Sequence, residues 1–386
     1  MRLIYPETGD PYYVVAPSYI GTSAGVRALH LLCHSLNVSG RSAYLLPDPT
    51  SMRLTFHTHP DLLTPCVTED VVRWHLKQKK LPIVVYSEVV SGNPYGAACA
   101  VRYVMNFPGL LGGDKSYAED ELCFGYSKSL AAASGFPENV LFLPAMDTRI
   151  FKPPPSSQHR SGACFYADKY QKVHGGKLYD VTRNCVEITR DEPGSQTPEQ
   201  IAALFQKSEL FFTYENTLLA TEAVLCGCPA VFIPNPYLHE IINVSELGME
   251  GYAWGTDANE IARAKATVAQ GAANYLRTFD VYWADLARFI TLTQGHAVAR
   301  RGMPRALGAE SVKLEKSPRS DPCPSFLSLL PKPVEREIAK LLSTLGFARL
   351  GTRIWNDSLD QRGRGIRIDE SIHRIVALLR SAGPAD

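Results

Sequence analysis

The sequence lacks the hydrophobic segments that place proteins in membranes. No apolar run approaches the roughly 20 residues of a spanning helix, and the opening MRLIYPETGDPYY lacks the apolar core of a signal peptide. Charge of one sign is also scarce, because 40 Lys and Arg face 39 Asp and Glu, a formal net charge of +1. So small a net charge gives no broad attraction to nucleic acid. These absences predict a soluble, cytoplasmic protein with no nucleic-acid partner.

Cysteine is present, but not in patterns that form disulfides or bind metal. The nine Cys are odd in number and have no CxxC spacing, and Cys226 and Cys228 are too close for a usual disulfide. We expect reduced thiols throughout. His57 and His59 could share a metal on a strand, yet no suitably spaced carboxylate or Cys follows closely. The acidic run Ala118–Glu121 holds no Asp-x-Asp triplet, so no metal site is predicted.

The stretch from 210 to 234, LFFTYENTLLATEAVLCGCPAVFIP, predicts strand, turn, helix and strand. Leu210–Tyr214 is an aromatic and aliphatic run, as in a strand buried on both faces. A helix is expected from about Leu218 to Leu225, ending at Gly227. The apolar run Ala230–Ile233 predicts the next strand. This order is typical of an open α/β sheet.

Polar residues gather where this predicted helix begins. Asn216 or Thr217 is a suitable N-cap, and Glu215 should lie at the carboxyl end of the strand, where α/β sheets bind ligands. Glu222 lies two helical turns further along, on the same face. Both carboxylates could therefore meet one polar ligand. The alternative is that they are ordinary capping and surface residues.

The N-terminal part reads as half of a nucleotide-binding type of fold. Tyr12–Ala16 and Ser42–Leu46 are predicted strands, and Val26–Leu36 has a helical period between them. The loop before the helix, PSYIGTSAG, is not a GxGxxG fingerprint. It offers small and polar groups to a ligand, or it forms a plain tight turn. Those groups are Gly21, Thr22, Ser23 and Gly25.

A third strand is predicted at Ile83–Tyr86, and Glu88 follows it. Glu88 should lie at the carboxyl end of this strand, which is where the residues of a ligand-binding cleft lie in α/β sheets. The alternative is that Glu88 caps the next segment. The pattern predicts a helix over Tyr95–Met105 that carries Arg102. Further along, the sequence predicts the strand Leu122–Tyr126 and a short helix after it.

A domain boundary is predicted after residue 150. Three consecutive prolines, at 153–155, are followed by the polar SSQHRSG, which is the composition of a linker. The next strand is expected at Gly162–Tyr166. Lys169, Lys172 and Lys177 follow it, and an ammonium group is a suitable partner for a phosphate. The alternative is that some of these lysines lie on the surface.

The C-terminal part predicts a long helix and an appendage. Tyr275–Thr293 is an aromatic-rich helix, and Arg300–Pro324 has the composition of a tether. Beyond it, Val334–Leu345 and Ile368–Leu379 are amphipathic. We expect this small helical appendage to be separable from the core. Its basic residues could meet anionic lipid or a partner; they are Arg349, Arg353, Arg362, Arg364 and Arg367.

The central stretch resembles the donor-binding segment of GT-B glycosyltransferases of the "group 1" type. That family has the acidic motif EGFG, a helix with a second Glu, and a turn such as EAMACGCP. In this sequence ENT replaces EGFG, and Glu-Ala and then Cys-Gly-Cys-Pro follow it. Six residues separate the two Glu where the family usually has seven. The position of Glu215 therefore departs further from the family than that of Glu222.

Two further segments carry the resemblance, which covers roughly Tyr12 to Gln294. The pattern E-x4-NP followed by VRY-x2-N-x-PG, from Glu88, is similar to bacterial surface-polysaccharide transferases. The run after Val140 resembles the family's interdomain linker P-x-G-V-D-x-x-x-F-x-P. Asp147, Phe151 and Pro153 match that linker, while Ala-Met replaces Gly-Val.

The resemblance implies an α/β, GT-B architecture, with two Rossmann-like domains facing a cleft and a small, mainly helical appendage. It places an acceptor-side domain at 1–150 and a domain that binds the nucleotide-sugar at 151–275. A helix at 276–300 would cross back to the first domain. Residues 301–386 would be a linker and an extension of unknown role.

The same resemblance assigns roles to the site residues. Glu88, Lys169 and Glu215 would be catalytic, with Glu88 near the acceptor hydroxyl, Lys169 on the donor diphosphate and Glu215 at the donor sugar. Glu222 would bind the ribose. The other donor-binding candidates are Gly21, Thr22, Ser23, Lys172, Lys177, Asn216 and Thr217. No metal or other cofactor is implied, because lysines and a helix N-terminus can carry the leaving phosphates.

The implied reaction moves a sugar from a nucleotide-sugar to a hydroxyl of a glycan or lipid-linked glycan, in the synthesis of a cell-surface polysaccharide. Residues 301–386 could contact a membrane or a partner enzyme. Three alternatives stay open. One is a non-hydrolysing nucleotide-sugar epimerase, which needs no acceptor, and another is a catalytically silent GT-B protein that binds a glycan or partner. The third is a phosphorylase, for which no lysine has a cofactor-anchoring context.

Overall fold

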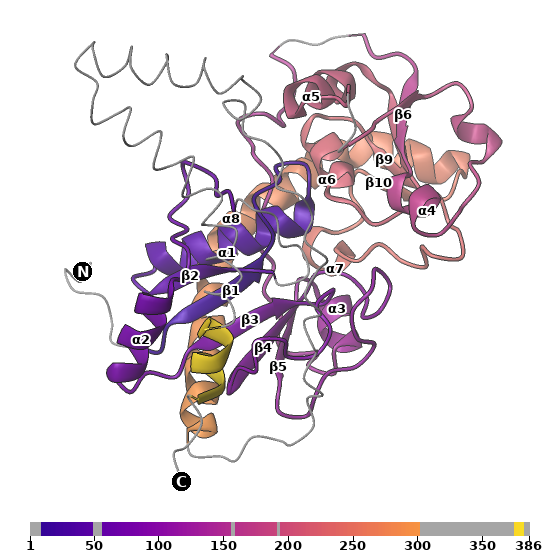
Figure 1. Cartoon of the computed structure of the whole chain (residues 1–386). Helices are drawn as coiled ribbons and strands as arrows, with labels where there is room; N and C mark the ends of the chain where they lie inside the picture. Colours follow the sequence, from indigo (N-terminus) through magenta and orange to yellow (C-terminus); the bar gives the residue numbers. More distant parts are fainter. Residues whose placement is uncertain (1–8, 49–55, 156–158, 191–193, 302–373, 382–386) are drawn as a thin grey trace, which may run out of the picture.

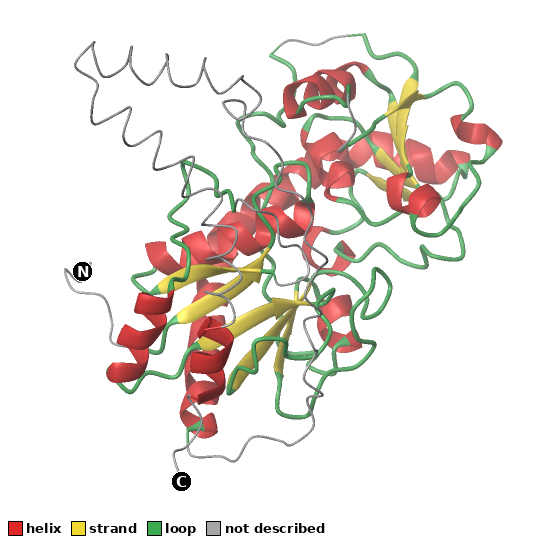
Figure 2. Ribbon diagram, in the orientation of Figure 1, coloured by secondary structure: helices red, strands yellow, loops and turns green. Residues whose placement is uncertain are grey.

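Short strands that are apolar along their whole length build two parallel sheets in this chain. The computed structural model describes residues 9–48, 56–155, 159–190, 194–301 and 374–381. Within these residues, each of two α/β domains is organised around one five-stranded sheet, with helices packed on its faces (Figures 1 and 2). The predicted two-domain α/β class is confirmed.

The first sheet has the order β2-β1-β3-β4-β5, and all its strand pairs are parallel. Its strands are β1 (Tyr12–Ala16), β2 (Ala43–Pro47), β3 (Ile83–Ser87), β4 (Cys99–Val104) and β5 (Leu122–Gly125). Its helices are α1 (Ala24–Val38), α2 (Glu69–Lys77) and α3 (Lys128–Ala133). Every residue of β1 is buried, because helices cover a parallel sheet on both sides.

The second sheet has the order β10-β9-β8-β6-β7 and is also parallel. Its strands are β6 (Ala163–Tyr166), β7 (Val186–Glu187), β8 (Leu210–Thr213), β9 (Ala230–Phe232) and β10 (Tyr252–Trp254). Its shorter helical elements are α4 (Asp168–Lys172), η1 (Asp180–Thr182), α5 (Pro198–Lys207), α6 (Leu218–Leu225) and α7 (Val244–Leu247). The predicted strand, turn and helix around Glu215 are therefore confirmed as β8 and α6.

One long helix, α8 (Ala258–Arg300), joins the two domains. It packs on α6 and β10 in the second domain and on β3, β4 and β5 in the first (Figure 1). The Tyr275 hydroxyl accepts a hydrogen bond from the Met146 backbone N–H at 2.9 Å, and Thr293 lies 2.7 Å from the Tyr12 hydroxyl. The predicted helix Tyr275–Thr293 is thus the middle of a longer one. No helix among the described residues has the length and apolarity needed to cross a membrane.

The helix predicted over Tyr95–Met105 is wrong, because this segment contains the strand β4. All six β4 residues are buried, and a strand buried on both sides shows no alternation that would separate it from a buried helix. Arg102 is fully buried on this strand and forms an ion pair with Glu121 at 2.7 Å.

The end of the C-terminal appendage packs on the first domain, where the sequence predicted an appendage apart from the core. Residues 374–381 are helical and lie on the first sheet (Figure 1). Ile375 and Leu379, each 2% exposed, belong to a core cluster with sheet residues such as Tyr13 and Val84. The chain forms no helix between β3 and β4, so this segment covers a sheet face that α2 covers only in part. The predicted run Val334–Leu345 and the five arginines from 349 to 367 lie outside the described residues.

This packing predicts that the 374–381 helix stabilises the first domain. Leu379→Ala removes buried methyl groups and should lower the free energy of unfolding by roughly 2 kcal/mol, near the lower limit for such a change, because the helix can detach. Arg374→Ala is the matched control. It removes an exposed pair with Glu69 at 3.5 Å, worth about 0–1 kcal/mol.

Denaturant unfolding of both variants measures the difference. A protein ending at residue 373 should also bind an apolar dye more strongly than one ending at 381, because its sheet face is uncovered. Equal stability for Leu379→Ala and the unchanged protein would contradict this packing.

Candidate functional site

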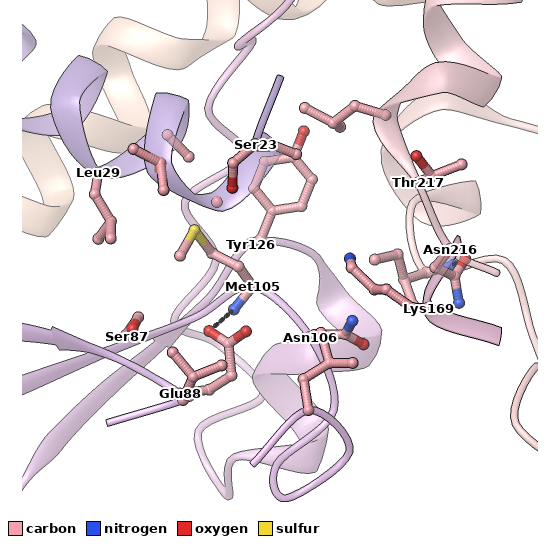
Figure 3. Close-up of a pocket in the computed structure, with 18 of the residues that line it drawn as sticks. Ser23, Leu29, Ser87, Glu88, Met105, Asn106, Tyr126, Lys169, Asn216 and Thr217 are labelled. Carbon is pink, nitrogen blue, oxygen red and sulfur yellow. Dashed lines mark hydrogen bonds between the residues drawn. The ribbon is translucent and has the colours of Figure 1, made fainter. Parts of the chain in front are cut away.

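A cavity of about 310 Å³ lies between the two domains. Residues that follow strands of both sheets line it, so the carboxyl ends of the sheets face each other across it (Figure 3). This is where open α/β sheets bind ligands. Glu88 and Asn106 follow β3 and β4 on one wall, and Lys169 and Asn216 follow β6 and β8 on the other. The sequence predicted three of these four positions.

Glu88 is the carboxylate of the first wall. Its Oε2 accepts a hydrogen bond from the Met105 backbone N–H at 3.0 Å (Figure 3). Burial raises its pKa to about 7, although the hydrogen bond from Met105 and the charge of Lys169 act to lower it. A carboxyl group with this pKa exchanges protons near neutral pH.

Arg102 fixes the backbone on either side of Glu88. Its guanidinium donates to the carbonyls of Ser87 at 3.2 Å, Val90 at 2.6 Å and Gly92 at 2.9 Å. A buried cation in a strand is a poor fit for a sheet unless it is paired, and Glu121 supplies that pair. Arg102 therefore acts through the loop as a positioning residue. The sequence could not reveal this role while its segment was assigned to a helix.

Lys169 is the cation that extends from the second wall (Figure 3). It follows β6 near the start of α4, and its side chain points across the cavity toward the first domain. Asn216 and Thr217 lie beside it, where α6 begins, and the Thr217 hydroxyl accepts a hydrogen bond from Leu219 N–H at 3.3 Å. A cation and a helix N-terminus on one wall suit an anionic ligand.

Glu215 is held against the backbone of α4. Its Oε2 accepts hydrogen bonds from the backbone N–H groups of Lys169 at 2.7 Å and Tyr170 at 3.0 Å. Its Oε1 is buried and has no hydrogen-bond partner among the described residues. Burial raises the pKa of Glu215, against the lowering effect of Lys169. The side chain lines a much smaller cavity, of about 20 Å³, that shares Lys169 and Asn216 with the larger one.

Glu222 is fully buried and forms ion pairs across the two domains. Its Oε1 accepts from Nη2 of Arg27, on α1, at 2.7 Å, and its Oε2 from Nη2 of Arg190 at 3.2 Å. Burial alone would lower the pKa of Arg27, but Glu222 more than offsets this and the pKa is raised. Arg190 also donates to the Thr22 carbonyl at 2.6 Å. Arginines therefore hold both carboxylate oxygens of Glu222. Its ribose-binding role stays a prediction.

The predicted residues divide between the cavity and its surroundings. Those that line the larger cavity are Thr22, Ser23, Glu88, Lys169, Asn216 and Thr217. Those that do not line it are Gly21, Lys172, Lys177, Glu215 and Glu222. Lys172 pairs with Asp168 at the surface, and Lys177 is exposed. The donor-binding roles of Lys172 and Lys177 stay predictions.

Several lining residues were not predicted, among them Tyr126, Arg190 and Asp48. The Tyr126 hydroxyl is buried without a hydrogen-bond partner among the described residues. Arg190 follows β7, which has only two residues. Tyr126 was predicted only as the end of a strand. Within the part of the chain that the structure describes, no three His, Cys, Asp or Glu side chains come together as metal ligands would.

Comparison with known proteins gives likenesses of fold. No protein-family model and no curated protein matches the sequence. AviGT4, a glycosyltransferase involved in avilamycin A biosynthesis, is 14% identical over 75% of this chain and 98% of its own, with a TM-score of 0.43. The glycosyltransferase SnogD from Streptomyces nogalater is 10% identical over 74% and 99%, with a TM-score of 0.37. The glycosyltransferase VinC, solved with DTDP, is 12% identical over 75% and 100%, with a TM-score of 0.36.

The architecture itself decides the fold class. Two five-stranded parallel sheets face one cavity with their carboxyl ends, and a single helix packs on both domains. The chain therefore has the GT-B fold that its sequence predicts.

Proposed function

We propose that the chain is a glycosyltransferase that binds a nucleotide-sugar in the cavity between its domains and transfers the sugar to an acceptor hydroxyl. One observation carries the proposal. A buried carboxyl group with a pKa near 7, Glu88, and a lysine, Lys169, occupy opposite walls of a cavity at the carboxyl ends of both sheets. This arrangement supplies a proton acceptor on one side and a partner for an anionic leaving group on the other.

The proposed step breaks one bond and forms one. The acceptor oxygen attacks the anomeric carbon of the donor sugar, and the bond from that carbon to the phosphate oxygen breaks. The electron pair of the broken bond leaves with the nucleoside diphosphate, and Lys169 balances its charge. The acceptor proton passes to the Glu88 carboxylate, whose hydrogen bond from Met105 fixes its orientation. No redox partner or metal enters this balance.

The first-domain wall supports an acceptor with an apolar surface beside its hydroxyl. The larger apolar side chains of this wall include Val26, Leu29, Val89, Met105 and Leu111. Of the two predicted acceptors, a lipid-linked glycan suits this wall better than a free glycan. Synthesis of a cell-surface polysaccharide in the cytoplasm remains part of the proposal. So does contact of residues 301–386 with a membrane or partner enzyme.

The direct test is incubation with a panel of nucleotide-sugars, with and without lipid-linked glycan acceptors. Release of nucleoside diphosphate and a product heavier by one sugar, both dependent on the acceptor, would support transfer. Conversion of the nucleotide-sugar without acceptor would instead indicate an epimerase. Binding of no nucleotide at all would favour a silent GT-B protein and contradict the proposal.

The first prediction from the proposed function concerns the acidic limb of the pH profile of kcat/KM. If Glu88 takes the acceptor proton, kcat/KM should rise with pH and level off above about 7, because the group must be ionised. Glu88→Gln keeps the size of the side chain and should lower kcat by about 10²–10⁴-fold. It should also abolish the limb near 7. A variant that keeps both its rate and this limb would rule out Glu88 as the base.

The second prediction concerns stability at the same residue. The pKa of Glu88 is raised above its ordinary value, so burial favours the protonated form and the cost of its charge grows as pH rises from about 4.5 to 7. Glu88→Gln should therefore change stability little at pH 4. At pH 8 it should raise the free energy of unfolding by as much as roughly 3 kcal/mol. Denaturant melts at both pH values measure this, and a pH-independent difference would contradict it.

The third prediction concerns Lys169. If its ammonium acts mainly on the charge that develops on the leaving diphosphate, Lys169→Ala should lower kcat by roughly 10²-fold and raise KM much less. Lys172→Ala and Lys177→Ala, whose side chains do not line the cavity, should lower kcat less. Steady-state kinetics at saturating donor distinguishes the three. A larger loss of kcat in either comparison variant would show that the wrong lysine has been assigned.

A further inference from the structure

The ion-pair cluster between the domains holds more positive than negative charge. The guanidinium groups of Arg27 and Arg190 both contact the single carboxylate of Glu222. The three side chains are 10%, 7% and 0% exposed, so water contributes little to their solvation. Two cations and one anion leave a formal charge of +1. Burying such an excess is unfavourable unless a further anion approaches it.

The excess charge lies at the wall of the larger cavity. Arg190 lines the cavity together with Lys169, from the same domain. The Nε atoms of Arg190 and Arg27 are buried and have no hydrogen-bond partner among the described residues. A guanidinium group has five N–H donors in a planar fork that matches phosphate oxygens. Both the unmatched charge and the unused donors are those of a site for an anion.

Among the described residues, Glu222 is the carboxylate that Arg27 and Arg190 contact. Asp168 forms an ion pair with Lys172. Glu88, on the opposite wall, has a pKa of about 7 and carries only part of a negative charge at neutral pH. Asp48 lines the cavity after β2, in the first domain. Lys169, on the same wall as Arg190, interacts with the Glu215 carboxylate, whose pKa it acts to lower.

We propose that Arg190 binds the diphosphate of the nucleotide-sugar, together with Lys169, and that Glu222 positions Arg190 rather than binding the ribose. This rests on the proposed function. Arg190 also donates to the Thr22 carbonyl of the first domain, and Arg27 joins Glu222 to α1. The anion therefore binds to a residue whose own contacts require both domains. Diphosphate binding and the contact between the domains are coupled through this cluster.

The test separates the phosphate groups from the rest of the nucleotide. Isothermal calorimetry compares UDP, GDP, ADP and dTDP with the corresponding nucleosides, on the unchanged full-length protein and on Arg190→Gln. We expect Arg190→Gln to weaken the best-bound diphosphate by at least tenfold and to leave the nucleoside within about twofold. Arg183→Gln is the matched control, because Arg183 is exposed and pairs with Asp180 away from the cavity. It should change neither affinity.

Arg190→Lys provides a second variant if Arg190→Gln does not fold. It keeps a positive charge next to Glu222 but loses the planar fork, and it should weaken the diphosphate severalfold with no effect on the nucleoside. Glu222→Gln distinguishes the two roles of that residue. A ribose ligand would weaken diphosphate and nucleoside alike, whereas a positioning residue would affect the diphosphate alone.

The outcomes distinguish this inference from the proposed function. An unchanged protein that binds none of the diphosphates would contradict the proposed function, and this inference with it. An unchanged protein that binds one of them, with Arg190→Gln or Arg190→Lys binding equally well, would overturn the role of Arg190 alone. Equal losses for diphosphate and nucleoside would show that Arg190 shapes the cavity without binding phosphate, and would also overturn it.

Discussion

One carboxylate, shared by the two domains, sets the arrangement of this protein. Glu222 has no exposed surface, and its oxygens are held by Arg27 from the first domain and Arg190 from the second. Removing one partner of a buried ion pair costs about 3–5 kcal/mol, because it leaves an uncompensated charge without water. Glu222 can keep both partners only while the domains are in contact, so its ion pair with Arg27 ties the position of this carboxylate to the arrangement of the two domains.

The cavity depends on that contact. Glu88 and Lys169 belong to different sheets, and neither wall alone encloses a ligand. The helix α8 holds the domains together through core contacts such as the one between Tyr12 and Thr293, but a helix along one side leaves rotation about it possible. The ion pairs on the cavity side restrict that rotation. Together they place a proton acceptor and a cation on facing walls.

Much of this arrangement follows from local sequence. Strands of a parallel sheet are buried on both faces, so they stand out as short apolar runs, and the polar residue after each run marks a cavity edge. Glu88 and Lys169 were found in this way. The same property explains the failure at Tyr95–Met105, where an apolar run without alternation fits a buried helix equally well. Arg102 was predicted to lie on that helix, whereas it lies inside the sheet, where Glu121 neutralises it.

What local sequence could not give is the choice of partner over long distances. The 374–381 helix covers a sheet whose nearest strand in the sequence lies about 250 residues earlier, and its amphipathic pattern does not identify the surface that it covers. Arg27 and Glu222 are 195 residues apart. A carboxylate on a helix beside a ligand-binding edge has the same sequence signature whether it faces a ribose or a guanidinium group. The difference is made by the other domain, which supplies the buried guanidinium group of Arg27. A family likeness that fixes the position of Glu222 therefore leaves its partner undetermined.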